Sequence, residues 1–161
     1  MADVTELKVT VAEADFDIAL LQRELLQGKC SEGAIATFTG YVRSENNERD
    51  VFTLELEHYP GMTEGSVGAI LSEAAERWPL QSATVVHRVG KLQPGDQIVW
   101  VGVSSSHREA AFAACEFVMD YLKTRAPFWK KELGPDGACW VDARESDTDR
   151  ASRWQGQQQQ Q

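Results

Sequence analysis

Apolar residues recur every three or four positions in three stretches of the chain, which is the spacing of one helix face. These stretches cover residues 15–27, 67–78 and 107–124. Ser106, with Glu109 three positions later, has the capping-box arrangement and is expected to begin the third helix. The pattern therefore predicts three amphipathic helices.

Five other stretches have the composition of β-strands, being β-branched, aromatic or alternating. They are residues 33–43, 51–58, 83–89, 97–103 and 138–141. The third and fourth are joined by a turn containing Pro94 and Gly95 and are expected to form a hairpin. The wholly polar segment 44–50 is expected to be a mobile loop. The element order lacks the strand-helix alternation of a parallel doubly wound fold, which favours an α+β class with a mostly antiparallel sheet.

The chain has 161 residues, of which 42% are hydrophobic, and this suits one compact domain. We assign the domain to residues 1–150 and expect residues 151–161, which end in a run of glutamines, to form a disordered polar tail. A net charge of −9 provides no general basic field, so nucleic-acid binding is disfavoured.

The cysteines, apolar runs, histidines and glycines limit where the protein is expected to reside and which cofactors it can bind. Three widely spaced cysteines without a CxxC pair, and the lack of an apolar signal segment, predict a reduced cytoplasmic protein. Apolar runs are far shorter than the roughly 20 residues of a membrane helix, so no membrane association is expected. The histidines have no ligand spacing, and no nucleotide-binding glycine motif occurs. The sequence therefore gives no support for a metal site or a nucleotide cofactor.

Four cations gather within nine residues near the end of the third predicted helix: Lys123, Arg125, Lys130 and Lys131. One interpretation is a helix end decorated with solvated charges, since cations interact favourably with the exposed carbonyls there. The alternative is a binding or catalytic site. Phe128 and Trp129 favour it, because these large apolar residues would anchor the lysines beside them.

His107 and Arg108 lie at the opposite end of the same helix, where free backbone N–H groups favour an anion. The simpler interpretation is that the preceding serines only cap the helix. A helix of some 18 residues is about 27 Å long, so its two ends cannot share one small pocket within a subunit. Either the two clusters are separate, or a second subunit brings them together. A serine hydrolase using Ser106 is disfavoured, because no GxSxG motif is present.

Five segments occur in the order and with nearly the spacing of one known family: GAIATFTGYVR, LELEHYPGM, the HR of VVHRVGKLQPGD, SSSHREAAF and MDYLKTRAPFWKKE. Over residues 33–144 the chain resembles the large, catalytic subunits of molybdopterin synthase. The polar segment 44–50 departs from the family in having no glycine.

The resemblance implies an α/β-hammerhead fold and a homodimer in which each subunit binds one small ubiquitin-like sulfur-carrier subunit. It implies a sulfurtransferase that converts cyclic pyranopterin monophosphate into molybdopterin, with sulfur from the carrier's C-terminal thiocarboxylate. Lys123 and Lys130 would be the catalytic residues. The substrate pocket, partly supplied across the dimer, would contain Arg43, His107, Arg108, Lys131, Glu132, Phe38, Met119 and Arg144.

A different class of function also fits part of this pattern. A non-catalytic module could bind the C-terminal tail of a small ubiquitin-like protein with the same aromatic anchors and a single cation. Such a module has no use for Arg43, His107 and Arg108 in addition, and their presence favours the enzyme.

Overall fold

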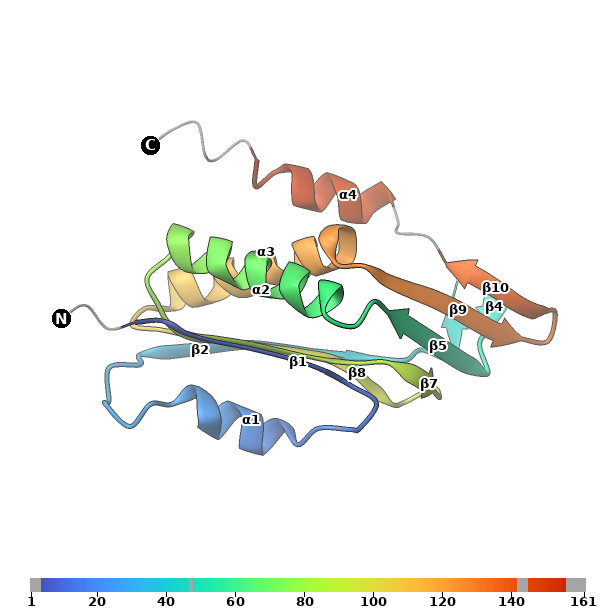
Figure 1. The fold of residues 1–161 in the computed structure, drawn as a ribbon, viewed down its shortest axis with the longest axis horizontal. Coiled ribbons are helices and arrows are strands. Elements are labelled where there is room, and N and C mark those ends of the chain that lie inside the picture. The colour runs from blue at the N-terminus through green and yellow to red at the C-terminus, as the bar shows by residue number, and fades with distance from the viewer. Residues whose placement is uncertain (1–3, 47, 142–144, 156–161) are drawn as a thin grey trace.

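The chain forms two four-stranded sheets, with helices on both faces of the first (Figure 1). This computed structural model describes residues 4–46, 48–141 and 145–155. The first sheet has the strand order β1-β6-β8-β2. Its strands are β1 (Glu6–Ala12), β6 (Leu80–Arg88), β8 (Gln97–Ser105) and β2 (Ala34–Tyr41). β1 runs parallel to β6 and the other neighbours are antiparallel, so the expected hairpin of β6 and β8 and the α+β class are confirmed.

The second sheet is entirely antiparallel and has the order β10-β9-β5-β7. Its strands are β10 (Gly137–Val141), β9 (Phe128–Gly134), β5 (Thr53–His58) and β7 (Gly90–Leu92). The segment expected to be a mobile loop contains two short paired strands, β3 (Glu45–Asn46) and β4 (Arg49–Asp50). Arg49 donates a hydrogen bond to the Gly137 carbonyl (2.8 Å), which ties this segment to the second sheet.

The three predicted helices are confirmed as α1 (Ile18–Leu25), α2 (Met62–Arg77) and α3 (Arg108–Arg125). α2 and α3 cover one face of the first sheet and α1 covers the other, as Figure 1 shows. A fourth helix, α4 (Glu145–Ser152), lies over α3 and was not predicted. No helix within the described parts of the chain is both long enough and apolar enough to cross a membrane.

The main core lies between the first sheet and the pair α2 and α3. Val67, Val85, Val101 and Phe117 are fully buried there. On the other face of the sheet, Leu25 of α1 packs with Trp100. This close approach needs Gly102, because a Cβ at that position would lie 2.2 Å from the Trp100 ring. α3 therefore packs directly against the first sheet, with Phe117 in the core between them.

The start of α3 differs from the prediction. Its N-cap is His107, which makes no side-chain capping bond. Ser106 Oγ instead accepts a hydrogen bond from Gln81 Nε2 (2.9 Å) and donates one to the Ser31 carbonyl (3.3 Å). The predicted capping box at Ser106 is therefore wrong, because β8 continues to Ser105 and directs the next side chain toward a neighbouring loop.

The C-terminal segment packs onto α3 through Trp154. This residue is buried among aromatic rings, and its indole Nε1 donates a hydrogen bond to Asp120 (2.8 Å). Packing thus continues beyond the expected domain boundary at residue 150. The division into domain and tail stays a prediction, since residues 156–161 lie outside the described chain.

Candidate active site

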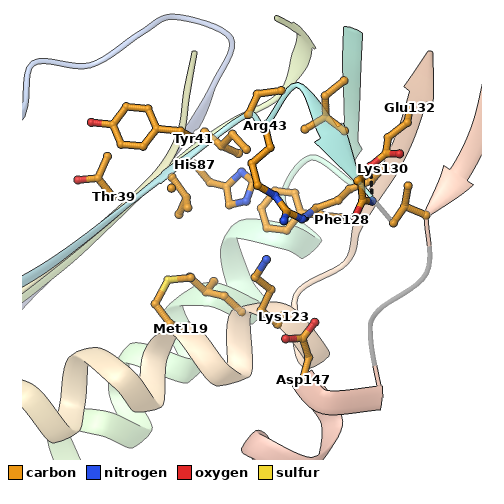
Figure 2. A pocket seen from close by; sticks show the side chains of 18 of the residues that line it. Thr39, Tyr41, Arg43, His87, Met119, Lys123, Phe128, Lys130, Glu132 and Asp147 are labelled. Atoms are coloured by element: carbon orange, nitrogen blue, oxygen red, sulfur yellow. Dashed lines mark hydrogen bonds between the residues drawn. The ribbon is translucent and has the colours of Figure 1, made fainter. Parts of the chain in front are cut away.

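A cavity of about 560 Å³ lies where the C-terminal end of α3 meets both sheets. Leu54, Val99, Leu122 and Phe128 form part of its apolar wall. Charged side chains reach it from four directions, and Figure 2 shows Lys123 and Asp147 pointing toward the rings of His87 and Phe128. The charged lining residues include Arg43, Lys123, Lys130, Glu132 and Asp147. The cavity therefore contains cations that can bind an anion, together with carboxylates that balance part of their charge.

The four cations predicted as a cluster, Lys123, Arg125, Lys130 and Lys131, do not all face the cavity, because the chain changes from helix to strand between them. Lys123 lies in the last turn of α3, Pro127 follows the helix, and β9 begins at Phe128. Alternate residues of a strand face opposite sides, so Lys130 and Glu132 line the cavity. Lys131 lies on the other side of β9, with its ammonium 5.5 Å from the centre of the Trp140 ring.

Arg125 is also directed away from the cavity. Its guanidinium donates a hydrogen bond to Glu73 (3.0 Å) and stacks on the Tyr121 ring at 3.6 Å. Of the four cations singled out from the sequence, all within the described chain, Lys123 and Lys130 are the two that line the cavity.

Burial changes the protonation of Lys130. Desolvation, followed by the charge and hydrogen bond of Lys123, lowers the pKa of Lys130 from 10.5 to about 8, while Asp147 and Glu132 oppose this shift. At neutral pH a fraction of Lys130 is therefore a free amine. A free amine can act as a base or a nucleophile, which an ammonium cannot.

An amide connects two charged walls of the cavity. Arg43 Nη2 donates to Asn46 Oδ1 (3.3 Å), and Asn46 Nδ2 donates to Glu132 Oε1 (2.6 Å). Asn46 belongs to β3, in the segment that lacks a glycine. This segment therefore orients both a cation and a buried carboxylate.

His87 of β6 lines the cavity beside the lysines. Its ring stacks on Phe128 with centroids 3.8 Å apart, and its Nδ1 lies 2.8 Å from the Arg88 carbonyl. Burial, followed by the nearby Lys130, Lys123 and His58, lowers the pKa of His87 from 6.5 to about 4. The histidine is therefore neutral at physiological pH.

The sequence-predicted site residues fall into three groups. Arg43, Phe38, Met119, Lys123, Lys130 and Glu132 line the cavity. His107 and Arg108 are exposed at the far end of α3, an 18-residue helix about 27 Å long. Lys131 is on the opposite face of β9, and Arg144 lies outside the described residues.

Sequence reasoning missed several polar residues of the cavity wall, among them His87, Asn46 and Asp147. Every residue from 82 to 87 is buried, so the strand has no alternation that could single out His87. Asn46 and Asp147 lie in polar segments without a periodic pattern. Within the described chain, no group of three or more His, Cys, Asp or Glu residues is placed to hold a metal ion.

Comparison with known proteins agrees with this architecture. The family model described as MoaE protein matches residues 11–125. The chain is 56% identical over 148 residues to the molybdopterin synthase catalytic subunit of Vibrio cholerae, covering 92% of this chain and 98% of that protein.

Solved structures share the fold. Molybdopterin cofactor biosynthesis protein E from Burkholderia multivorans has a TM-score of 0.79 and 50% identity, covering 93% of this chain and 97% of that one. A protein-protein complex of subunits 1 and 2 of the molybdopterin-converting factor from Helicobacter pylori matches with a TM-score of 0.67 and 21% identity, over 86% and 91% of the two chains. The second likeness shows the fold alone. From the family match and the extent of identity, the chain belongs to the MoaE family of molybdopterin synthase catalytic subunits.

Proposed function

We propose that this sulfurtransferase converts cyclic pyranopterin monophosphate into molybdopterin in the cavity described above, with Lys123 and Lys130 as its catalytic residues. The sulfur comes from the C-terminal thiocarboxylate of a small ubiquitin-like carrier subunit. The observation that carries the proposal is the pair of lysines in one cavity, of which Lys130 is partly deprotonated near neutral pH.

The two lysines have different environments and are assigned different roles. Lys130 is partly buried and supplies the amine that accepts a proton or attacks as a nucleophile. Lys123 is exposed at the end of α3 and, with Arg43, positions the reacting thiocarboxylate and the substrate in the cavity. Glu132 orients Arg43 through Asn46.

The substrate phosphate is assigned to His107 and Arg108 of a second copy of the chain. Both residues are exposed at the N-terminal end of α3, where the helix dipole favours an anion. The length of α3 separates them from the lysines of their own chain. A homodimer with a shared site would bring the two clusters together.

The partner is proposed from chemistry and from a related assembly. A flexible thiocarboxylate tail needs an open, cationic cavity, and the two subunits of the Helicobacter pylori factor form a complex. The alternative, a module that only binds the tail, leaves the partly deprotonated Lys130 without a use. All three cysteines are free, which supports a reducing cytoplasmic location.

Reconstitution tests this function directly. The purified chain, a thiocarboxylated carrier and cyclic pyranopterin monophosphate should yield the dithiolene product. Lys123→Ala should reduce the rate at least about a hundredfold, the scale for a positioned catalytic group, while carrier binding persists. Lys91→Ala, which changes an exposed lysine of β7, serves as the control. Carrier binding by the wild type without any product would instead support the binding module.

The phosphate assignment has its own measurement. Arg108→Ala should weaken binding of the cyclic pterin phosphate by about 1.5–3 kcal/mol, the range for a hydrogen bond to a charged group. Unchanged affinity in a calorimetric titration would place the phosphate elsewhere.

A further inference from the structure

His87 has a defined hydrogen-bonding state that the roles assigned so far do not use. A backbone carbonyl can only accept, so the 2.8 Å contact with the Arg88 carbonyl places a proton on His87 Nδ1. A neutral ring then carries an unprotonated Nε2. This atom has no hydrogen-bond partner among the described residues, and the ring forms part of the cavity wall.

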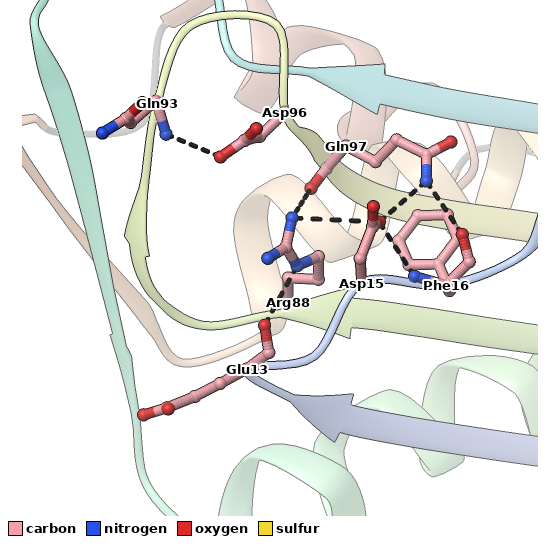
Figure 3. A network of polar contacts seen from close by, with 7 residues as sticks. All are labelled: Glu13, Asp15, Phe16, Arg88, Gln93, Asp96 and Gln97. Atoms are coloured by element: carbon pink, nitrogen blue, oxygen red, sulfur yellow. Dashed lines mark hydrogen bonds and ion pairs between the residues drawn. The ribbon is translucent and has the colours of Figure 1, made fainter.

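The carbonyl that selects this tautomer is itself held in place. The Arg88 side chain donates from Nε to the Glu13 carbonyl and from Nη1 to the Gln97 carbonyl, at 3.1 Å each (Figure 3). Its Nη1 also lies 3.8 Å from Asp15. The backbone at Arg88 is thus fixed between the segment after β1 and the start of β8, and the His87 ring is clamped against Phe128 on its face.

The other polar groups that line the cavity are either charged or carry hydrogens that they can donate. Arg43, Lys123 and Lys130 are donors, with Lys130 partly neutral, and Glu45, Glu132 and Asp147 are carboxylates. Thr39, Tyr41 and Asn46 are uncharged, but each combines a donor with its acceptor oxygen. Nε2 of neutral His87 is an acceptor alone, and it lies beside an aromatic ring. With a pKa of about 4 the ring stays neutral near pH 7, so Nε2 keeps the lone pair that accepts a hydrogen bond, and the ring is a poor proton carrier.

The geometry points to His87 as a further substrate-binding residue, whose Nε2 accepts a hydrogen bond from an N–H or O–H group of the pyranopterin. This inference rests on the proposed function, since it names a contact within the same site. A reduced pterin carries several N–H donors, and a buried donor left without an acceptor is costly. The contact would therefore orient the ring of the substrate while His107 and Arg108 of the second copy bind its phosphate.

Binding by matched variants separates this role from simple packing. His87→Phe keeps an aromatic ring against Phe128 but removes the acceptor, whereas His87→Gln restores an oxygen acceptor on a chain of similar reach. We expect His87→Phe to raise the Kd for cyclic pyranopterin monophosphate about five- to tenfold, the loss of one hydrogen bond, and His87→Gln to recover part of it. His58→Phe, at a histidine outside the cavity lining, is the control.

The tautomer provides a second test, which does not depend on how a variant binds the substrate. In the wild-type chain labelled with ¹⁵N-histidine, Nδ1 of His87 should be protonated and Nε2 unprotonated, and saturation with the substrate should shift the Nε2 resonance more than the Nδ1 resonance. The chain has three histidines, so the His87 signals are identified by their loss in either variant.

The outcomes distinguish this inference from the proposed function. Wild-type chain that does not bind the pterin phosphate overturns both. Binding by the wild type, with an unchanged Kd for folded His87→Phe or an unmoved Nε2 resonance, overturns the role of His87 and leaves the proposed function intact.

Discussion

Replacing Lys130 with methionine should abolish sulfur transfer and at the same time stabilise the fold at neutral pH. Methionine has a similar length and no charge, so it keeps the packing of the cavity wall and removes the cost of burying an ammonium. Residues that serve catalysis at the expense of stability are common in active sites. Turnover should fall while stability rises. The lost activity of this variant can therefore not be explained by loss of folding.

The magnitude follows from the pKa of Lys130. Each tenfold change in acidity corresponds to about 1.4 kcal/mol, so lowering the pKa from 10.5 to about 8 costs the native state about 3 kcal/mol at pH 7. Because the unfolded chain binds this proton more tightly, the cost disappears as pH rises from 8 toward 10.5. Allowing for the solvent in the cavity, Lys130→Met should gain about 1–3 kcal/mol at pH 7 and less than about 1 kcal/mol at pH 10.

The same pKa sets the supply of free amine for the reaction. At pH 7 about 9% of Lys130 is neutral, against about 0.03% of an ordinary lysine with a pKa of 10.5. The rate of the wild type should therefore rise with pH and level off above about pH 8. The charge of Lys123 lowers the pKa of Lys130. A variant without this charge should therefore have its inflection at a higher pH.

Urea unfolding of wild type and Lys130→Met at pH 7, 8.5 and 10 measures the stability difference, and turnover at each pH measures the rate. Lys91→Met is the matched control, because Lys91 is exposed on β7 and its replacement should change stability little at any pH. A variant that is less stable than the wild type at pH 7, or a stability difference independent of pH, would refute the reasoning.

Three further predictions concern the wider architecture. Mixing Lys123→Ala chains with Arg108→Ala chains should restore turnover, because one of the two sites of each heterodimer combines an intact Lys123 with an intact Arg108. Mass spectrometry confirms that heterodimers form. Heterodimers without recovered turnover would mean that both residues of a site come from one chain. Asp120→Asn should lower the free energy of unfolding by about 1.5–3 kcal/mol in urea titrations, since Trp154 donates to this buried carboxylate. Asn46→Ala should raise KM several-fold with a smaller change in kcat, because two charged walls of the cavity lose their shared partner; an unchanged KM would show that the bridge does not orient the site.

The charge balance of the cavity explains how an acidic protein can bind an anionic substrate. The net charge of −9 excludes a general attraction, but Arg43, Lys123 and Lys130 converge on one small volume. Glu132 and Asp147 reduce the repulsion between these cations. Both carboxylates raise the pKa of Lys130, whereas burial lowers it. Recognition is therefore local and depends on the fold.

Local periodicity decided much of the secondary structure. The helical repeat predicted α1, α2 and α3. β1 was missed although Leu7, Val9 and Val11 alternate with polar residues. α4 has no apolar repeat, and its packing onto α3 depends on contacts such as that between Trp154 and Asp120, which are 34 positions apart.

The sequence by itself determined three of the helices, the hairpin of β6 and β8 and the family resemblance, and it pointed to six of the residues that line the cavity. The length of α3 also followed from the sequence, and it separates Arg108 from Lys123 within one chain. Only the tertiary structure decided that Lys131 and Arg125 face away from the cavity and that His87 and Asp147 face it. The physical reason is that periodicity reports which side of an element is apolar, whereas a pocket and the pKa values within it depend on burial and on charges brought together from distant segments.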